Sequence, residues 1–463
     1  MPTSRKDPCT QPETAAAPVH AEAAPGLPAA EVPPAQQPLL ERPGRRPAGP
    51  RRFLRDVAPA YLSNGAIGLV FTASGPIAVT LAVGAAGGLS QDQLASWVFG
   101  ILFSGGAATL LMSLLYRQPL GFAWSIPGTV LLGPSLQHLS FAEVVGTFFT
   151  AGLLILALGA TGVVRRIMVM IPMPIVMAMV AAVFLRFGTD IVSSSQSNPA
   201  IATPMVGAFL LLTAVPALGK FLPPVLGTLV AGCLAVAVSG QFVAGVPGPL
   251  LAAPVFTPPV FTWAAQLELV VPLALTVLFV QNGQGIAVLR AAGHLPPVNV
   301  FAIVSGVFSL LNASLGAVSA CVTGPTNALL TSSGVKERQY TAAVTYGCLA
   351  LAGAALAPTL TRLMLATPKE FVLVLGGIAM LRALQQAFVT AFSTTFTLGA
   401  LVTFVVTISG LDLFNIHAAF WGLVIGYAVS RLLERPDHLD LEGINPQGLP
   451  RTSPAPSGGP QSH

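Results

Sequence analysis

The chain has 463 residues, of which 53% are hydrophobic and only 8% are charged. A soluble globular protein carries about 25% charged residues, so this composition excludes a soluble fold and predicts an all-α polytopic membrane protein in a lipid bilayer. The formal net charge of +5 does not indicate a nucleic-acid partner, because the basic residues form short clusters between apolar runs.

Polar tails flank the apolar region. Residues 1–50 hold 12 prolines with many Ala, Glu and Gln, and residues 436–463 are similarly polar. Such segments cannot bury enough apolar surface to offset the entropy lost on ordering, so both tails are expected to be disordered. The first long apolar run begins near Val57, so no signal peptide is expected. Residues 51–435 therefore form the predicted transmembrane domain.

The apolar stretches indicate how often the chain crosses the bilayer. A hydrocarbon core of about 30 Å requires about 20 apolar residues per helix. Divided at Gly, Pro and charges, the chain gives fourteen stretches, and those near 120–136, 172–187 and 318–334 are short and interrupted. In chain order they lie near 57–83, 93–115, 120–136, 141–163, 172–187, 200–218, 221–240, 264–289, 298–316, 318–334, 339–359, 367–388, 390–410 and 414–432.

The basic residues set the orientation, because cytoplasmic connections are rich in Lys and Arg. With fourteen spans and both termini in the cytoplasm, twelve basic residues lie inside and three lie outside. The inner set is Arg51, Arg52, Arg55, Arg117, Arg165, Arg166, Lys220, Arg290, Lys336, Arg338, Arg431 and Arg435, and the outer set is Arg186, Arg362 and Lys369. A count of thirteen or fifteen spans would scatter these charges over both faces.

Fourteen spans divide into seven plus seven, with the first repeat near 57–240 and the second near 264–432. A repeat with an odd number of spans inserts its second copy upside down, which is a common transporter architecture. The sequence therefore predicts an inverted repeat.

The third stretch of each repeat is broken in the same way. Residues 123–135 read AWSIPGTVLLGPS and residues 319–334 read SACVTGPTNALLTSSG. Pro removes a backbone donor and Gly relaxes the chain, so a non-helical stretch followed by a half-helix is expected at segments 3 and 10. Non-helical backbone at membrane depth is tolerated inside protein or around a cavity. Two half-helix N-termini facing each other present N–H groups that suit an anion.

Candidate substrate-binding residues lie in these segments and in the eighth span. The eighth span carries three amide side chains within one turn, and buried amides require hydrogen-bond partners. Substrate contact and helix packing are the two interpretations. The candidates are Ser125, Gly128, Thr129, Gln281, Asn282, Gln284, Thr323, Gly324, Thr326 and Asn327.

Four stretches of this chain resemble the benzoate membrane transporter family of benzoate/proton symporters. They are RRFLRDV at 51–57, AWSIPGTVLL at 123–132, FVQNGQGIAVLRAAGHLPPV at 279–298 and SACVTGPTNAL at 319–329. The resemblance implies the seven-plus-seven fold shared with nucleobase/cation symporters and sulfate permeases. It further implies a core domain of spans 1–4 and 8–11 that moves against a gate domain of spans 5–7 and 12–14. In the similar nucleobase symporters a carboxylate occupies roughly the place of Gln281.

Proton coupling requires an ionisable group, and acidic residues inside membrane spans are functional candidates. Glu268 and Glu143 are the best candidates here, although both lie near predicted span ends, where an interfacial position is the simpler interpretation.

The expected function is secondary active import of benzoate or a similar aromatic carboxylate with protons across the inner membrane. One alternative is a nucleobase or inorganic-anion transporter of the same fold, and another is a non-transporting receptor or a membrane-embedded enzyme. The sequence shows no catalytic, nucleotide-binding or metal-ligand motif, so no enzyme activity, cofactor or metal is expected. The oligomeric state, a homodimer included, stays open.

Overall fold

The computed structural model describes residues 40–44, 46–164, 172–215, 217–218, 222–243, 248–332, 334–393, 395–411, 413 and 418–441. By their internal contacts the residues divide into Met1–Pro38 and Leu39–His463, and all that follows concerns the second unit. Residues 1–39 and 442–463 of the expected tails lie outside the described residues. So do Arg165, Arg166 and Lys220 of the charge argument.

Long apolar helices dominate the described part of the chain. Six are long and apolar enough to cross a membrane, or seven if a helix pair bent by 71° over 336–365 counts as one span. The six are α2 (Pro59–Ala86), α3 (Gln91–Tyr116), α5 (Phe141–Thr161), α7 (Met173–Ser197), the run Trp263–Ala291 and α17 (Lys369–Phe392). The protein is therefore a polytopic, mostly helical membrane protein.

The other predicted spans hold shorter elements, so helix length alone does not establish fourteen crossings. Five are apolar helices of 10–17 residues: α8 (Pro199–Ala214), α10 (Pro224–Ser239), α13 (Val298–Ser314), α18 (Thr397–Ile408) and α19 (Ala418–Leu433). Two further predicted spans each consist of a short strand followed by a short helix. They are β1 (Phe122–Trp124) with α4 (Ile126–Ser135), and β2 (Ala320–Val322) with α14 (Gly324–Leu330). The bent pair contains η3 (Lys336–Arg338), α15 (Tyr340–Ala355) and α16 (Ala357–Leu365), and the ends carry α1 (Pro50–Asp56) and α20 (Arg435–Leu441).

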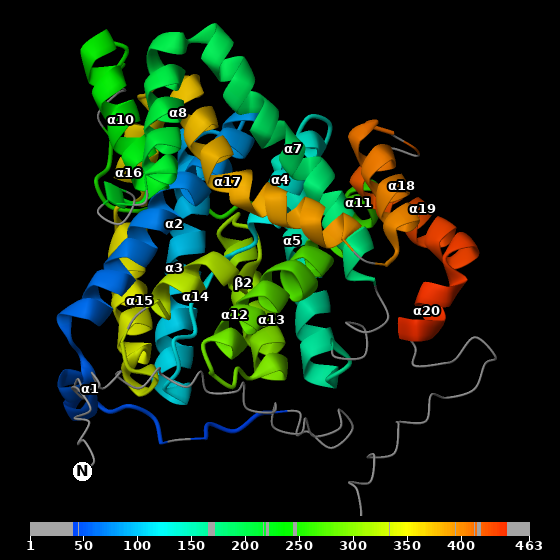
Figure 1. Ribbon diagram of the computed structural model, residues 1–463, viewed down its shortest axis with the longest axis horizontal. Coiled ribbons are helices and arrows are strands. Elements are labelled where there is room, and N and C mark those ends of the chain that lie inside the picture. The colour runs from blue at the N-terminus through cyan, green and yellow to red at the C-terminus, as the bar shows by residue number, and fades with distance from the viewer. Residues whose placement is uncertain are drawn as a thin grey trace, which may run out of the picture. The chain divides into compact units, whose positions relative to one another are not determined.

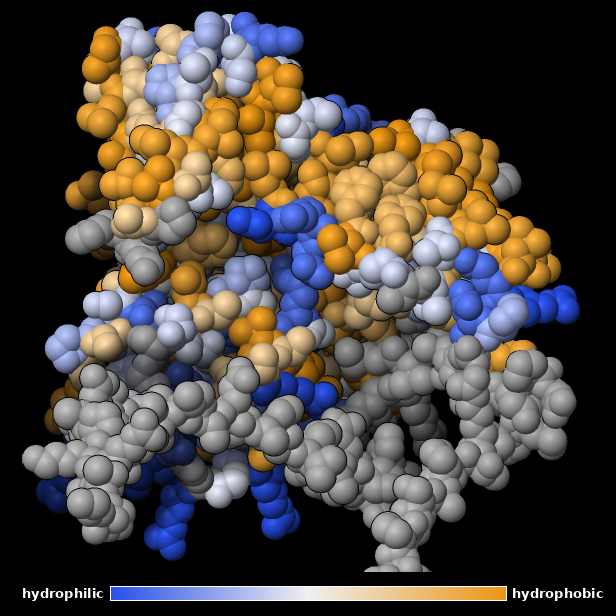
Figure 2. All heavy atoms as spheres, in the orientation of Figure 1, coloured by the Kyte–Doolittle hydropathy of each residue, from blue (hydrophilic) through white to orange (hydrophobic). Residues whose placement is uncertain are grey.

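Apolar side chains cover much of the exterior. Figure 2 shows wide hydrophobic areas over α8 and α10 and over α17 to α19. Leu153, Leu211, Leu234 and Val238 are among the large side chains that are more than half exposed. Soluble monomers rarely expose such continuous apolar surface, which fits contact with lipid.

The helices pack in pairs that correspond between the two halves of the chain. The pairs α3–α15 and α5–α13 are both extensive, and α8–α10 has its counterpart in α18–α19. In addition, α2 contacts α4 and α14, while α12 contacts α14 and α11 contacts α4. Figure 1 shows α7 and α17 crossing beside the bundle that contains α2, α3, α13 and α15. When the predicted spans are numbered along the chain, exchanging each span for the one seven places away turns α3–α15 into α13–α5 and α8–α10 into α18–α19.

Glycine allows a close approach of α2 and α17. A Cβ atom built on Gly75 of α2 collides with the Ala379 side chain of α17. Helix backbones approach this closely only where side chains are small, so α2 lies directly against α17.

A polar cluster ties α1 to α3 and α15. The Tyr340 hydroxyl donates to Asp56 Oδ2 at 2.9 Å, and Asp56 also lies 3.6 Å from Arg52 Nε and 4.0 Å from Arg117 Nη2. Asp56 and Arg117 are buried, so this cluster fixes the start of the transmembrane region.

The residues ahead of α1 contact the bundle. Glu41 accepts hydrogen bonds from the backbone N–H groups of Asn299 at 3.0 Å and Val300 at 3.1 Å. These groups lie in the first turn of α13, where an acidic side chain is stabilising. Part of the predicted N-terminal tail thus caps a helix.

Candidate functional site

The two broken segments meet as a buried two-stranded sheet. Strand β1 pairs antiparallel with β2, and Ala123 lies opposite Cys321. Backbone bonds extend this pairing at both ends, from Ser125 N to Ser319 O at 3.0 Å and from Thr323 N to Gly121 O at 3.4 Å. Each strand thus supplies hydrogen-bond partners for backbone groups of the other. Non-helical backbone inside a membrane protein needs such partners, because no water or lipid group provides them.

Side chains from neighbouring helices bond the outer edges of both strands. Thr109 of α3 accepts from Phe122 N at 2.8 Å, and Ser309 of α13 accepts from Ala320 N at 3.0 Å. Helices α3 and α13 occupy corresponding places in the two halves. The same kind of hydroxyl therefore supports each strand from a corresponding helix.

Two of the candidate asparagines hold this frame together. Asn327 donates to Gly121 O at 2.9 Å and accepts from Gly121 N at 2.9 Å, which links α14 to the start of β1. Asn282 accepts from Val322 N at 2.8 Å and bonds Ser305 of α13. Both amides are buried and occupied by protein partners.

Short helices begin directly after the strands. Ser125 is the N-cap of α4, where its Oγ accepts from Gly128 N at 3.1 Å, and Thr129 Oγ1 donates to Ser125 O at 3.0 Å. Thr323 is the N-cap of α14, but its buried hydroxyl has no partner among the described residues. A proline lies in the first turn of each helix, where its missing N–H costs nothing.

The helical run Trp263–Ala291, which packs against β2, changes from α-helix to π-helix and back to α-helix. Helix α11 (Trp263–Leu275) passes into a π-helical segment, η2 (Thr276–Gln281), and then into α12 (Asn282–Ala291). Pro272 inside α11 lacks an N–H donor, which interrupts the regular helical bonding. Single π-turns inside α-helices occur frequently at functional sites.

The π-helical segment brings polar groups to the starts of both short helices. Ser125 Oγ donates to Thr276 Oγ1 at 3.0 Å. Gln281 is buried, at 4% exposed, and its amide makes no hydrogen bond within the described part of the chain. The Gln284 side chain lies against Gly324, where a built Cβ would be 3.0 Å from Gln284 Cβ. Thr326 is buried in the first turn of α14.

The two acidic candidates have different surroundings. Glu268 of α11 is buried, accepts a hydrogen bond from Ser135 Oγ, and lies 3.0 Å from His138 Nε2. Its side chain is thus enclosed by protein, next to the exposed His138. Glu143 forms a capping box with Ser140 at the start of α5 and accepts from Thr262 Oγ1 at 2.9 Å.

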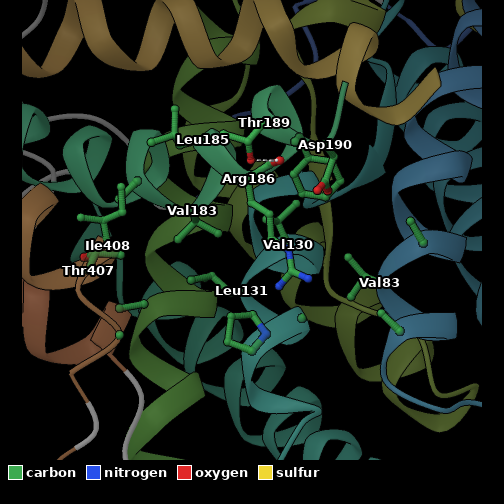
Figure 3. A pocket seen from close by; sticks show the side chains of 18 of the residues that line it. Val83, Val130, Leu131, Val183, Leu185, Arg186, Thr189, Asp190, Thr407 and Ile408 are labelled. Carbon is green, nitrogen blue, oxygen red and sulfur yellow. Dashed lines mark hydrogen bonds between the residues drawn. The ribbon is translucent and has the colours of Figure 1, made fainter. Parts of the chain in front are cut away.

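A cavity of about 370 Å³ opens between α4 and α7 (Figure 3), and we call it the Arg186 cavity. The ends of α2 and α18 and residues of α17 and α19 also line it. Its walls include Val83, Val130, Leu131, Val183, Arg186 and Asp190. A narrower crevice shares Leu131 and Val183 with this cavity and reaches Pro127 and Thr276.

Sequence reasoning missed several of these residues. Thr276 and Ser135 are isolated hydroxyls in apolar runs, and Arg186 was counted only as an orientation charge.

The arrangement defines a class of protein: an integral membrane protein in which two strand-interrupted segments pair between apolar helices. The family model described as benzoate membrane transport protein, BenE, matches residues 55–432. The chain belongs to this BenE family.

Two curated relatives support this placement. The chain is 30% identical over 389 residues to the inner membrane protein YdcO of Escherichia coli K12, covering 82% of this chain and 98% of the relative. It is 26% identical to the benzoate membrane transport protein of Acinetobacter baylyi, covering 80% of this chain and 94% of that protein.

Two solved structures show which known fold this chain shares. The transmembrane domain of the cyanobacterial bicarbonate transporter BicA matches with a TM-score of 0.54 at 14% identity, covering 86% of this chain and 99% of that domain. The murine anion transporter Slc26a9 in its inward-facing state matches with a TM-score of 0.54 at 12% identity, covering 82% of this chain and 69% of that chain.

Proposed function

We propose that this protein is a secondary active transporter that imports benzoate or a similar aromatic carboxylate together with protons across the inner membrane. Family membership supports transport, and the name of the Acinetobacter relative supports the substrate class. The observation that carries the proposal is the pairing of β1 with β2 beside the unpartnered Gln281 amide.

The proposed architecture is fourteen spans in two inverted repeats, near 57–240 and 264–432, with both termini in the cytoplasm. The corresponding helix pairs support it. So do the matched N-caps Ser125 and Thr323 and the matched strand supports Thr109 and Ser309. The core domain contains the sheet, and the gate domain contains α7, α8, α10 and α17 to α19.

The substrate carboxylate binds where α4, α14 and η2 meet. Gln281 donates its free amide N–H groups, and the N-terminus of α4 adds a positive potential. A neutral amide suits an anionic substrate because an acidic side chain would repel it. The further contacts come from Ser125, Gly128, Thr129, Gln284, Thr323, Gly324 and Thr326, while Asn282 and Asn327 hold the frame.

Glu268 is the proposed proton carrier. Its carboxylate is buried, and the half-exposed His138 side chain connects it to the surface at the end of α4. A proton that passes from the imidazole to this carboxylate neutralises a buried charge, which favours movement through the membrane interior. Glu143 is the second candidate, although its capping box already engages it.

Uptake of labelled benzoate into proteoliposomes tests the proposal. An inward proton gradient is expected to drive accumulation above equilibrium, and a protonophore is expected to abolish it. Uptake that ignores the imposed gradient would refute the coupling. Competition by aromatic acids, uracil and sulfate tests the substrate, and we expect only the aromatic acids to compete.

A further inference from the structure

The Arg186 cavity combines one cationic side chain with apolar walls. Its volume of about 370 Å³ falls within the range of small-molecule sites. Val83, Val130, Leu131 and Val183 supply aliphatic surface, and among the described lining residues Arg186 is the only basic one and Asp190 the only acidic one. This combination suits a small ligand with an apolar ring and a negatively charged group.

The Arg186 side chain makes neither a hydrogen bond nor an ion pair within the described part of the chain. Asp190, one helical turn further along α7, interacts with it only electrostatically. Figure 3 shows the guanidinium directed toward the α4 residues Val130 and Leu131, apart from the Asp190 carboxylate. Its donors are thus available to a ligand.

The location of the cavity connects it to the proposed substrate site. It lies between α4 of the proposed core domain and α7 of the proposed gate domain. It shares Leu131 and Val183 with the narrow crevice that Thr276 also lines, and Thr276 is bonded to Ser125. In the proposed orientation the cavity opens toward the outer face, because the ends of α2 and α4 that line it are the outer ends.

We propose that the Arg186 cavity is an outward-facing access site in which Arg186 binds the carboxylate of the incoming aromatic acid. The planar guanidinium offers two parallel N–H donors that match a carboxylate, and the apolar walls contact the ring. The ionised acid is selected here before it passes Leu131 and Val183. This inference rests on the proposed function and names a recognition residue for it.

Equilibrium binding of labelled benzoate to the full-length protein in nanodiscs tests the inference. Arg186→Gln removes the charge, and we expect benzoate affinity to fall about 10- to 100-fold, the range for a lost hydrogen bond to a charged group. Arg186→Lys keeps the charge but not the bidentate geometry, so its loss is expected to be smaller. Benzamide, which is neutral, is expected to compete equally well in wild type and Arg186→Gln. Lys369→Gln is the control, because it removes a charge from the same predicted face without lining the cavity.

A second variant tests the cavity without changing its charge. Gly133 lines the cavity, and a Cβ atom built there meets nothing within 4 Å. Gly133→Leu therefore fills the space and is expected to weaken benzoate binding at least tenfold. Gly207→Leu is the matched control, because Gly207 is also helical and open but lies in α8, away from the cavity.

The outcomes separate the two proposals. Proton-driven uptake by wild type, with unchanged benzoate affinity in Arg186→Gln and Gly133→Leu, overturns this inference and leaves the proposed function intact. An equal loss of benzamide and benzoate binding in Arg186→Gln also overturns it, because charge recognition would be absent. Failure of the wild-type protein to bind benzoate refutes both.

Discussion

Two neighbouring amides in the eighth span have opposite roles. Gln281 is buried without a protein partner, whereas Asn282 bonds β2 and α13. The residue types and their exposure are nearly the same. Their positions at the end of the π-helical segment and the start of α12 determine which amide stays free for a ligand.

A pair of leucine substitutions separates these roles. Gln281→Leu removes a ligand donor but no internal bond, so we expect benzoate binding to weaken about 10- to 100-fold with an unchanged melting temperature. Asn282→Leu leaves the Val322 N–H unsatisfied, which costs about 1–3 kcal/mol, so its melting temperature is expected to fall. Radioligand binding and thermal unfolding in the same detergent measure both quantities. Equal melting temperatures for the two variants would contradict this assignment.

Glu268 offers a test of proton coupling that leaves the local structure in place. In Glu268→Gln the amide oxygen still accepts from Ser135, but the side chain cannot carry a proton. We expect benzoate exchange between equal concentrations to continue and accumulation driven by a pH gradient to disappear. Glu370→Gln, another buried acid that bonds Ser197, is the control. Full pH-driven accumulation by Glu268→Gln would transfer the role to Glu143 or to another group.

At the scale of elements, Asn327 is the side chain that couples the two broken segments. Asn327→Asp replaces its donor by an acceptor facing Gly121 O and Thr323 O. The lost bonds and the repulsion are expected to lower the free energy of unfolding by about 2–4 kcal/mol, more than a single unsatisfied group costs. Thermal unfolding measures this change. Ser90→Asp, at the exposed N-cap of α3 where the Ser90 side chain accepts from Gln93 N and Asp serves as well as Ser, is expected to change it little.

The sequence shows where helices break but not how the broken pieces meet. Gly and Pro in AWSIPG and VTGPTN locate the interruptions, because both residues act through local backbone chemistry. The register of Ala123 opposite Cys321 depends on contacts almost 200 residues apart, and three-residue strands have too short a pattern to predict it. The π-helical segment is likewise a result of packing.

From the sequence, candidate site residues can be recognised by the type of their side chain but not by their hydrogen-bond partners. Polar side chains in apolar runs stand out, so Ser125, Gln281 and Asn327 were identified. Whether an amide is occupied or free depends on its neighbours in space. Arg186 was missed because the predicted span 172–187 ends beside it, where a basic residue fits the orientation rule. In the structure α7 runs on to Ser197, so Arg186 lies in the middle of this helix.

At the scale of the whole molecule, transport requires the proposed core to move against the proposed gate. Helix α2 lies directly against α17 at Gly75 and Ala379. Gly75→Val is expected to force these helices apart, reducing benzoate uptake at least fivefold while binding changes less than twofold. Gly353→Val adds the same side chain where a built Cβ finds its nearest neighbour, Leu102, at 3.6 Å, and is the control for both assays. Wild-type uptake by Gly75→Val would show that this contact does not limit the movement.

The central claim is that an aromatic carboxylate binds where the two strand-interrupted segments meet the π-helical segment. Crystals of the full-length protein grown with 4-iodobenzoate test it directly, because anomalous scattering locates the iodine. We predict carboxylate density beside Gln281 and the start of α4, with or without a second molecule in the Arg186 cavity. An empty junction at saturating ligand, with ordered iodobenzoate only elsewhere, would contradict the account.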